Sequence, residues 1–210
     1  GHGWPATYWQ SGKLLADAME RQLEQSGVHF ADFTRVLDLG CGCGRLLRHL
    51  PALTKAALHG CDYNSRHISW CQHNLPFAQF TQNSLLPPLP YQDHSFDFIY
   101  MRSVFTHLTR ESQLAWLGEI HRVLQPGGIL LFTTQGELFA ANLAAAQAAI
   151  FRDTGFLENH GGKEGSNAYG SFQTRDYTLT KLGRGFAPMG FWPGQANENQ
   201  RQDTYIWRSR

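Results

Sequence analysis

Val36-Leu37-Asp38-Leu39-Gly40-Cys41-Gly42-Cys43-Gly44 is the stretch that decides the fold. A short apolar run with a β-branched start gives way to three glycines at alternate positions, and leucines follow at helical spacing. The pattern predicts a strand, a tight turn and a helix over 45–50. Glycines let such a turn approach a ligand closely, and we expect the first N–H groups of the helix to point outward unpaired. An anionic or carboxylate-bearing ligand fits there.

The spacing of the glycines indicates which ligand the turn binds. A dinucleotide fingerprint needs its third glycine at position 45, which is Arg45, and no Gly-Lys-Ser/Thr of a P-loop follows. An acid, Asp38, followed by Gly40, Gly42 and Gly44 resembles the first motif of the class I S-adenosylmethionine-dependent methyltransferases, Asp/Glu-x-Gly-x-Gly-x-Gly. A plain strand-to-helix turn is the alternative interpretation, so the rest of the chain has to support the resemblance.

Length and composition limit the class of protein. The 210 residues, 42% of them hydrophobic, are enough for one large core, so we expect a single domain over 1–210. A net charge of +1 provides no basic field for nucleic acid or for an anionic membrane. No apolar run is long enough to span a membrane, and the N-terminus lacks a signal pattern. These features predict a cytoplasmic protein without a nucleic-acid or membrane partner.

The cysteines raise the question of a metal site. Cys41, Cys43, Cys61 and Cys71 all lie in one third of the chain, with several histidines nearby. Cys41-x-Cys43 does not have the Cys-x-x-Cys spacing of a zinc knuckle, and ligation there would compete with a ligand of the glycine turn. We therefore expect four reduced thiols and no metal site.

A second acid supports a nucleotide-type cofactor. Residues 56–62 form a short apolar segment that ends at Asp62, about twenty residues beyond the glycine turn. In a nucleotide-binding fold this spacing carries a carboxylate to the ribose, where it accepts hydrogen bonds from both hydroxyl groups. Tyr63 follows directly, and we expect its ring to lie against the adenine face.

Two further motifs extend the resemblance. The family places an acid, or sometimes Asn, near position 83 to bind the adenine amino group, and here that residue is Asn83, whose side-chain carbonyl can accept the hydrogen bond. Leu-Gln-Pro-Gly-Gly at 124–128, followed by an apolar strand, is similar to the turn before the fifth strand of these enzymes. The resemblance therefore covers residues 36–134 in the right order.

The resemblance implies an α/β fold, a three-layer sandwich around a seven-stranded, mostly parallel sheet whose last strand is antiparallel and lies between the fifth and sixth. The expected strands are 36–39, 56–62, 77–81, 95–101, 129–133, 185–191 and 203–208, and an Ala-rich helix is expected over 136–151. The cofactor is S-adenosyl-L-methionine, and the implied cofactor-binding residues are Asp38, Gly40, Cys41, Gly42, Asp62, Tyr63, Asn83, Ser84, Leu85 and Met101.

The acceptor side of the site is expected to combine several segments. Residues 4–27 form an N-terminal helix and lid, in which Tyr8 and Trp9 supply large rigid side chains over the ligand. A glycine-rich insert over 155–176 is too long for an ordinary loop and faces the acceptor. The candidate acceptor-binding residues are Tyr8, Trp9, Gln135, His160 and Tyr169.

The chemistry is predicted from one histidine and one missing motif. His107, just after the strand over 95–101, is the candidate general base, and a histidine that only packs the helix start is the alternative. Asp/Asn-Pro-Pro-Tyr, typical of enzymes that methylate bases or glutamine, is missing after that strand. We therefore expect O-methylation of a small molecule such as a sugar or secondary metabolite. The alternatives are N-methylation, a nicotinamide oxidoreductase and a non-catalytic cofactor-binding module.

Overall fold

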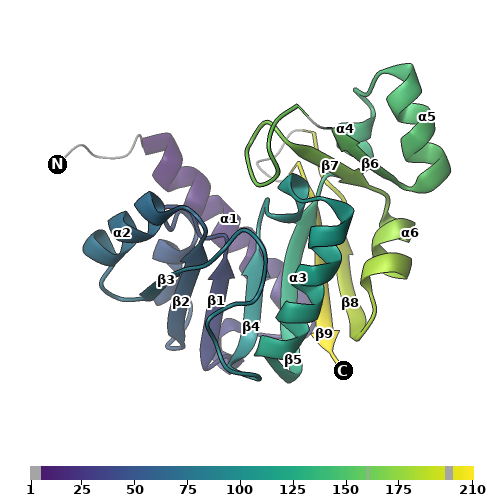
Figure 1. Cartoon of the computed structure of the whole chain (residues 1–210). Helices are drawn as coiled ribbons and strands as arrows, with labels where there is room; N and C mark the ends of the chain where they lie inside the picture. The colour runs from purple at the N-terminus through teal and green to yellow at the C-terminus, as the bar shows by residue number, and fades with distance from the viewer. Residues whose placement is uncertain (1–5, 160, 197–200) are drawn as a thin grey trace.

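A seven-stranded sheet forms the centre of the computed structural model, which describes residues 6–159, 161–196 and 201–210. Its strands run in the order β3-β2-β1-β4-β5-β9-β8, and β9 is antiparallel to both of its neighbours. The predicted α/β fold, with the last strand inserted between the fifth and sixth, is confirmed (Figure 1). The strand bounds are β1 Arg35–Leu39, β2 Ala57–Asp62, β3 Gln79–Gln82, β4 Phe96–Met101, β5 Leu124–Thr134, β8 Phe186–Trp192 and β9 Asp203–Ser209.

Alternating side chains of the central strands fill two separate cores. Val36 faces one layer while Leu37 faces the other, because successive residues of a strand point to opposite faces. The first core is covered by α1 (Ala6–Gln25), the 3-10 helix η2 (Leu47–Ala52) and α2 (Ser65–Asn74). The second core is covered by α3 (Arg110–Val123), together with α6 (Arg175–Tyr177) and the π-helical η4 (Thr178–Leu182). This arrangement gives the predicted three layers.

Two predicted helices differ from the structure. The segment 45–50 is a turn followed by the 3-10 helix η2, which contains Pro51, a residue that cannot donate to a helical ladder. The expected helix over 136–151 is divided into α4 (Glu137–Ala140) and α5 (Ala145–Thr154). Phe151 is the one buried residue of α5 and α4 has none, so little apolar burial holds a continuous helix together.

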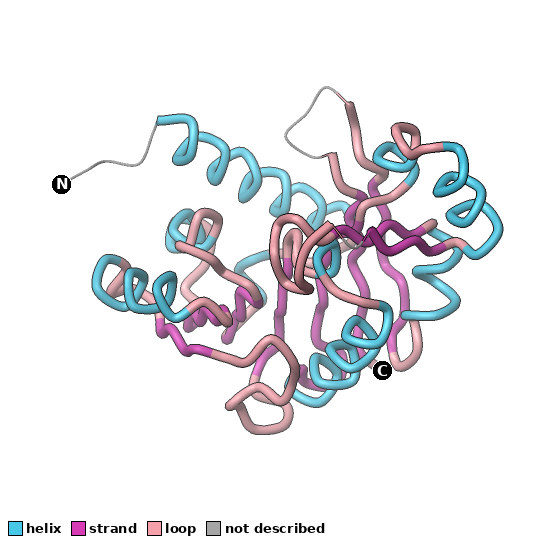
Figure 2. Tube along the Cα trace, turned by 45° about the horizontal axis from the view of Figure 1, so that its top comes forward, coloured by secondary structure: helices cyan, strands magenta, loops and turns pink. Residues whose placement is uncertain are grey.

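The insert builds a small hairpin over one end of the sheet. β6 (Phe156–Asn159) pairs antiparallel with β7 (Gly170–Gln173). The loop between them lies above the carboxyl ends of the parallel strands, beside the 3-10 helix η3 (Phe105–His107), as Figures 1 and 2 show. η1 (Phe30–Asp32) completes the described elements. The insert therefore covers the edge at which open α/β sheets bind ligands.

Candidate active site

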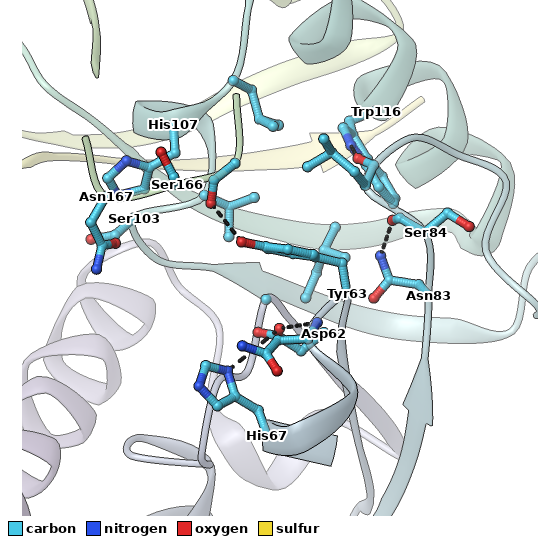
Figure 3. Close-up of a pocket in the computed structure, with 17 residues that line it drawn as sticks. Asp62, Tyr63, His67, Asn83, Ser84, Ser103, His107, Trp116, Ser166 and Asn167 are labelled. Carbon is cyan, nitrogen blue, oxygen red and sulfur yellow. Dashed lines mark hydrogen bonds and ion pairs between the residues drawn. The ribbon is translucent and has the colours of Figure 1, made fainter. Parts of the chain in front are cut away.

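A cleft of about 540 Å³ lies between the strand ends and the hairpin loop. Polar side chains gather at both of its ends, and Tyr63 crosses between them (Figure 3). The cleft is lined by Leu39, Gly40, Asp62, Tyr63, Asn64, His67, Asn83, Ser84, Leu85, Ser103, Val104, His107, Leu108, Trp116, Gly165, Ser166 and Asn167.

The glycine turn contributes shape rather than free donors. The amides of Gly40 and Cys41 both donate to the carbonyl oxygen of Cys61, at 2.8 and 2.9 Å, and that of Gly42 donates to Oδ2 of Asp62 at 2.9 Å. These three turn amides are therefore engaged within the fold, and the expectation of outward N–H groups in the segment after the turn stays a prediction. Gly40 has a φ of +79°, and a Cβ there would overlap Cγ2 of Val104. A glycine is needed because the turn closes directly against the wall of the cleft.

Asp62 sits where a ribose is expected. Its carboxylate is buried and accepts from two main-chain amides, Gly42 at 2.9 Å on Oδ2 and Asn64 at 2.8 Å on Oδ1. Nδ1 of His67 lies 3.6 Å from Oδ1. Each carboxylate oxygen retains acceptor capacity after these contacts, so two hydroxyl donors of a ribose fit the group.

The far end of the cleft suits an adenine ring. Oδ1 of Asn83 is a buried acceptor without a partner among the described residues, while Nδ2 of the same side chain donates to the carbonyl of Ser84 at 2.6 Å. Trp116 and Leu85 form the wall, held together by a 3.0 Å hydrogen bond from Nε1 of Trp116 to the Leu85 carbonyl. An exocyclic amino group would donate the hydrogen bond that Oδ1 of Asn83 lacks, and the apolar side chains of Trp116 and Leu85 line the same part of the cleft. The residues present therefore fit S-adenosylmethionine.

Asp38 lies beneath the turn rather than in the cleft. Burial raises the pKa of Asp38 to about 7, and the charge of Asp62 raises it further, against the lowering effects of the Tyr100 hydroxyl and of Arg45. A cation bound above the turn would favour the ionised form.

His107 reaches the other end of the cleft from η3. Its Nδ1 lies 2.9 Å from the carbonyl oxygen of Tyr169. Since a carbonyl can only accept, Nδ1 carries the hydrogen, and the neutral ring keeps its lone pair on Nε2. The hairpin loop thus fixes the tautomer of a histidine that lines the cleft.

The main chain also fastens the loop over the cleft. The amide of Gly165 donates to the His107 carbonyl at 2.8 Å, and the Tyr63 hydroxyl donates to the Gly165 carbonyl at 2.9 Å. Oε1 of Glu164 accepts from the amide and the hydroxyl of Thr109, at 2.8 and 2.9 Å. The loop is a roof held on both sides of the cleft.

Asp38 and three other predicted cofactor residues do not line the cleft. The side chains of Cys41 and Met101 are buried in the two opposite cores, and Gly42 contributes its amide to Asp62. All four cysteines are free thiols. Cofactor contacts by Cys41, Gly42 and Met101 stay predictions, in which the main chain would be the contacting group.

The predicted acceptor residues are dispersed. Tyr8 and Trp9 lie on α1, where the guanidinium of Arg48 stacks at 5.4 and 5.7 Å from their ring centres, and neither lines the cleft. Tyr169 is buried and contributes its carbonyl. The Gln135 carbonyl accepts from the amide of Gln173 at 2.9 Å beneath the hairpin. The remaining candidate, His160, lies outside the described residues.

Several residues that line the cleft were not predicted from the sequence. Ser103 has a φ of +57°, rare for a residue with a side chain, and its amide donates to Oγ1 of Thr133 at 2.9 Å. No pattern in a single sequence predicts a positive φ at a serine. The other lining residues that were not predicted as site residues are Leu39, Asn64, His67, Val104, Leu108, Trp116, Gly165, Ser166 and Asn167.

Comparison with known proteins identifies the fold and the domain. Residues 36–128 match the family model described as a methyltransferase domain. The chain carries a methyltransferase domain. Solved structures of the same fold include S-adenosylmethionine-dependent methyltransferases. A methyltransferase of this class from Methanosarcina mazei superposes with a TM-score of 0.64 at 20% identity, over 83% of this chain and 92% of that chain. The N-methyltransferase NodS of Bradyrhizobium japonicum, solved with S-adenosyl-L-homocysteine, gives 0.60 at 15% identity, over 94% and 87%.

Curated relatives of the methyltransferase domain act on different acceptors. Sterol 24-C-methyltransferase erg6 of Schizosaccharomyces pombe is 35% identical over 139 residues, covering 61% of this chain and 36% of that protein. Fatty-acid O-methyltransferase of Mycolicibacterium smegmatis is 35% identical over 102 residues, covering 47% and 36%. The chain spans about a third of the length of these relatives. No helix in the described ranges is long and apolar enough to cross a membrane.

Proposed function

We propose that this protein transfers a methyl group from S-adenosylmethionine to a hydroxyl oxygen of a small-molecule acceptor, with His107 as the general base. The observation that carries the proposal is the hydrogen bond from Nδ1 of His107 to the Tyr169 carbonyl. It leaves the Nε2 lone pair available in the cleft, where it can accept the proton of a hydroxyl group.

The cofactor would be held by the residues of the cleft. Asp62 would accept from the ribose hydroxyls, Asn83 from the adenine amino group, and Tyr63 and Leu85 would flank the ring. When bound, S-adenosylmethionine supplies a methyl group on a positively charged sulfur, whose reactivity belongs to the cofactor. The protein has to align the acceptor, exclude water and remove a proton.

The roof loop suits the exclusion of water. Tyr63 and Glu164 fasten the loop from opposite sides, so the acceptor would be enclosed between the loop, Ser103 and His107. Holding the acceptor oxygen near both Nε2 and the cofactor turns a bimolecular reaction into an effectively unimolecular one.

His107→Asn is the sharpest test of the base. The Asn amide nitrogen can replace Nδ1 as donor to the Tyr169 carbonyl, so the roof contact is retained while the lone pair is lost. We expect turnover at neutral pH to fall by about 10²- to 10⁴-fold, with the affinity for S-adenosylhomocysteine unchanged. Radiolabelled methyl transfer to a panel of hydroxy and amino compounds, with calorimetry of the cofactor product, measures both quantities.

Two outcomes would contradict the proposal. Full turnover of His107→Asn on a hydroxyl acceptor would show that His107 is not the general base. Methylation confined to amines would show that the acceptor atom is nitrogen rather than oxygen. A protein that binds the cofactor product but methylates nothing in the panel would favour the non-catalytic module.

A further inference from the structure

A second cavity, of about 280 Å³, adjoins the cleft at Ser103, which lines both. Three arginines from distant parts of the chain converge on it. Arg45 follows the glycine turn, Arg102 follows β4, and Arg201 precedes β9. Gln202 lines the cavity as well. Because like charges repel, three cationic side chains around one small cavity beside a candidate active site favour the binding of an anion.

None of the three guanidinium groups is neutralised by a carboxylate at ion-pair distance within the described part of the chain. Nη1 of Arg102 is buried without a partner there, and burial, with the nearby charge of Arg45, lowers the pKa of Arg102 to about 10. The carboxyl group whose charge interacts with Arg45 is Asp38, buried beneath the turn. A desolvated guanidinium with an unused donor is costly unless a ligand completes it.

Another arginine of the same region shows the contrast. Arg48 donates to the carbonyls of Gly44 and Cys43, at 2.9 and 2.6 Å, and stacks on Trp70, so its role in the fold is complete. The guanidinium of Arg45 lies 5.9 Å from the ring centre of Tyr8, and that of Arg201 lies 5.1 Å from the ring centre of Phe139. Stacking of this kind positions a guanidinium and leaves its N–H edge available for an anion.

Gln202, an uncharged residue of the cavity wall, is held in place by hydrogen bonds. Oε1 of Gln202 accepts from the hydroxyls of Ser103 and Thr133, at 2.9 and 2.7 Å. Because its oxygen is engaged, the amide nitrogen of Gln202 remains a donor. The wall thus offers donors from three arginines and one amide.

We propose that this cavity, the arginine cavity, binds a carboxylate or phosphate group of the methyl acceptor. The inference rests on the proposed function, since it assigns the acceptor of the same site. Ser103 separates the arginine cavity from the cleft that suits the cofactor, so an acceptor anchored here would reach the cleft past Ser103.

Charge favours the acceptor over the cofactor as the source of the anion. S-adenosylmethionine carries a sulfonium, an ammonium and one carboxylate, so its net charge is positive. Three arginines around its amino-acid end would face an ammonium as well as a carboxylate. An anionic acceptor lowers the positive charge that the cofactor and arginines accumulate together. The acceptor class is therefore a hydroxylated carboxylic acid or a hydroxylated phosphate ester.

The test uses inorganic phosphate and acetate as probes of the full chain saturated with S-adenosylhomocysteine. Binding is followed by chemical-shift titration for the wild type, Arg102→Gln and Arg201→Gln. Arg184→Gln, an exposed arginine outside both cavities, is the matched control. We expect Arg102→Gln and Arg201→Gln to weaken anion binding by about 10- to 100-fold, with the affinity for S-adenosylhomocysteine changed less than about twofold.

Each outcome decides the proposal. It is overturned if the wild type binds neither anion, or if Arg184→Gln weakens binding as much as the cavity variants. It is also overturned if the cavity variants lose affinity for S-adenosylhomocysteine and decarboxylated S-adenosylmethionine binds poorly to the wild type, because the arginines then hold the cofactor. Failure of methyl transfer, in contrast, would leave the anion titration unchanged, so failures of the two proposals can be told apart.

Discussion

Asn83 permits a quantitative test of where the adenine lies. Its Oδ1 is buried without a partner among the described residues, so the free protein already bears the desolvation of that acceptor. An adenine amino group would restore the missing hydrogen bond. A cofactor analogue in which hydrogen replaces the amino group cannot do so, and leaves Oδ1 buried and unpaired.

The size of the effect follows from that unpaired atom. A buried acceptor without a partner costs about 1–3 kcal/mol, which corresponds to a preference of about 5- to 150-fold for S-adenosylhomocysteine over its deamino analogue. Asn83→Ala removes the acceptor, so the preference is expected to fall close to one. Asn83→Asp keeps an acceptor oxygen and loses the 2.6 Å donation to Ser84, so it is expected to retain the preference.

The assay is a double-mutant cycle by calorimetry with both ligands. Asn74→Ala is the matched control, because Asn74 is an exposed asparagine whose Nδ2 donates to the Trp70 carbonyl at 2.7 Å, away from the cleft. The coupling energy between the amino group and residue 83 isolates this one contact. If Asn83→Ala discriminates against the deamino analogue as strongly as the wild type does, the adenine does not lie on Asn83, and the placement of the cofactor is wrong.

Two further predictions concern stability. Gly40→Ala combines a positive φ with an overlap on Val104, whereas its control, Gly27→Ala, has a φ of +75° and nothing within 4 Å of the added Cβ. Urea unfolding is therefore expected to show a loss of unfolding free energy that is about 1–3 kcal/mol larger for Gly40→Ala. Equal losses would refute the close approach of Gly40 to Val104. Asp38→Asn tests the buried carboxyl. Because its pKa is raised in the folded state, from 3.8 to about 7, ionisation destabilises the fold as pH rises from 4 to 7. In cofactor-free protein the variant should therefore gain stability relative to the wild type over that interval, by up to about 4 kcal/mol, with a plateau above pH 7; a difference independent of pH would contradict the raised pKa.

The parts of the fold that the sequence predicted are those encoded in local patterns. Apolar strands alternating with helices, the glycines at 40–44 and the acid at the end of β2 are short-range features, and parallel pairing then brings the strand ends to one edge. A ribose-binding role for Asp62 could be predicted because it depends on the chemistry of its own side chain. The antiparallel β9 came from the resemblance rather than from any local pattern.

The parts that the sequence could not predict depend on main-chain groups. The Cys61 carbonyl accepts hydrogen bonds from two amides of the glycine turn, and the Tyr169 carbonyl accepts from Nδ1 of His107. Every residue has a carbonyl, so no residue type marks these positions. The arginine cavity was missed for a related reason, since Arg45, Arg102 and Arg201 are ordinary surface-type residues until the fold brings them together.

The same main-chain contacts couple the roof to the base. The His107 carbonyl accepts from the Gly165 amide, while Nδ1 of His107 donates to the Tyr169 carbonyl, so the middle of the loop and its C-terminal end both contact one residue. Lifting the loop would break the bond that holds Nδ1 as the donor, and the ring would then lose its fixed tautomer and orientation. Closure over an acceptor and preparation of the Nε2 lone pair would therefore occur together, which would keep proton removal from proceeding in an open, hydrated cleft.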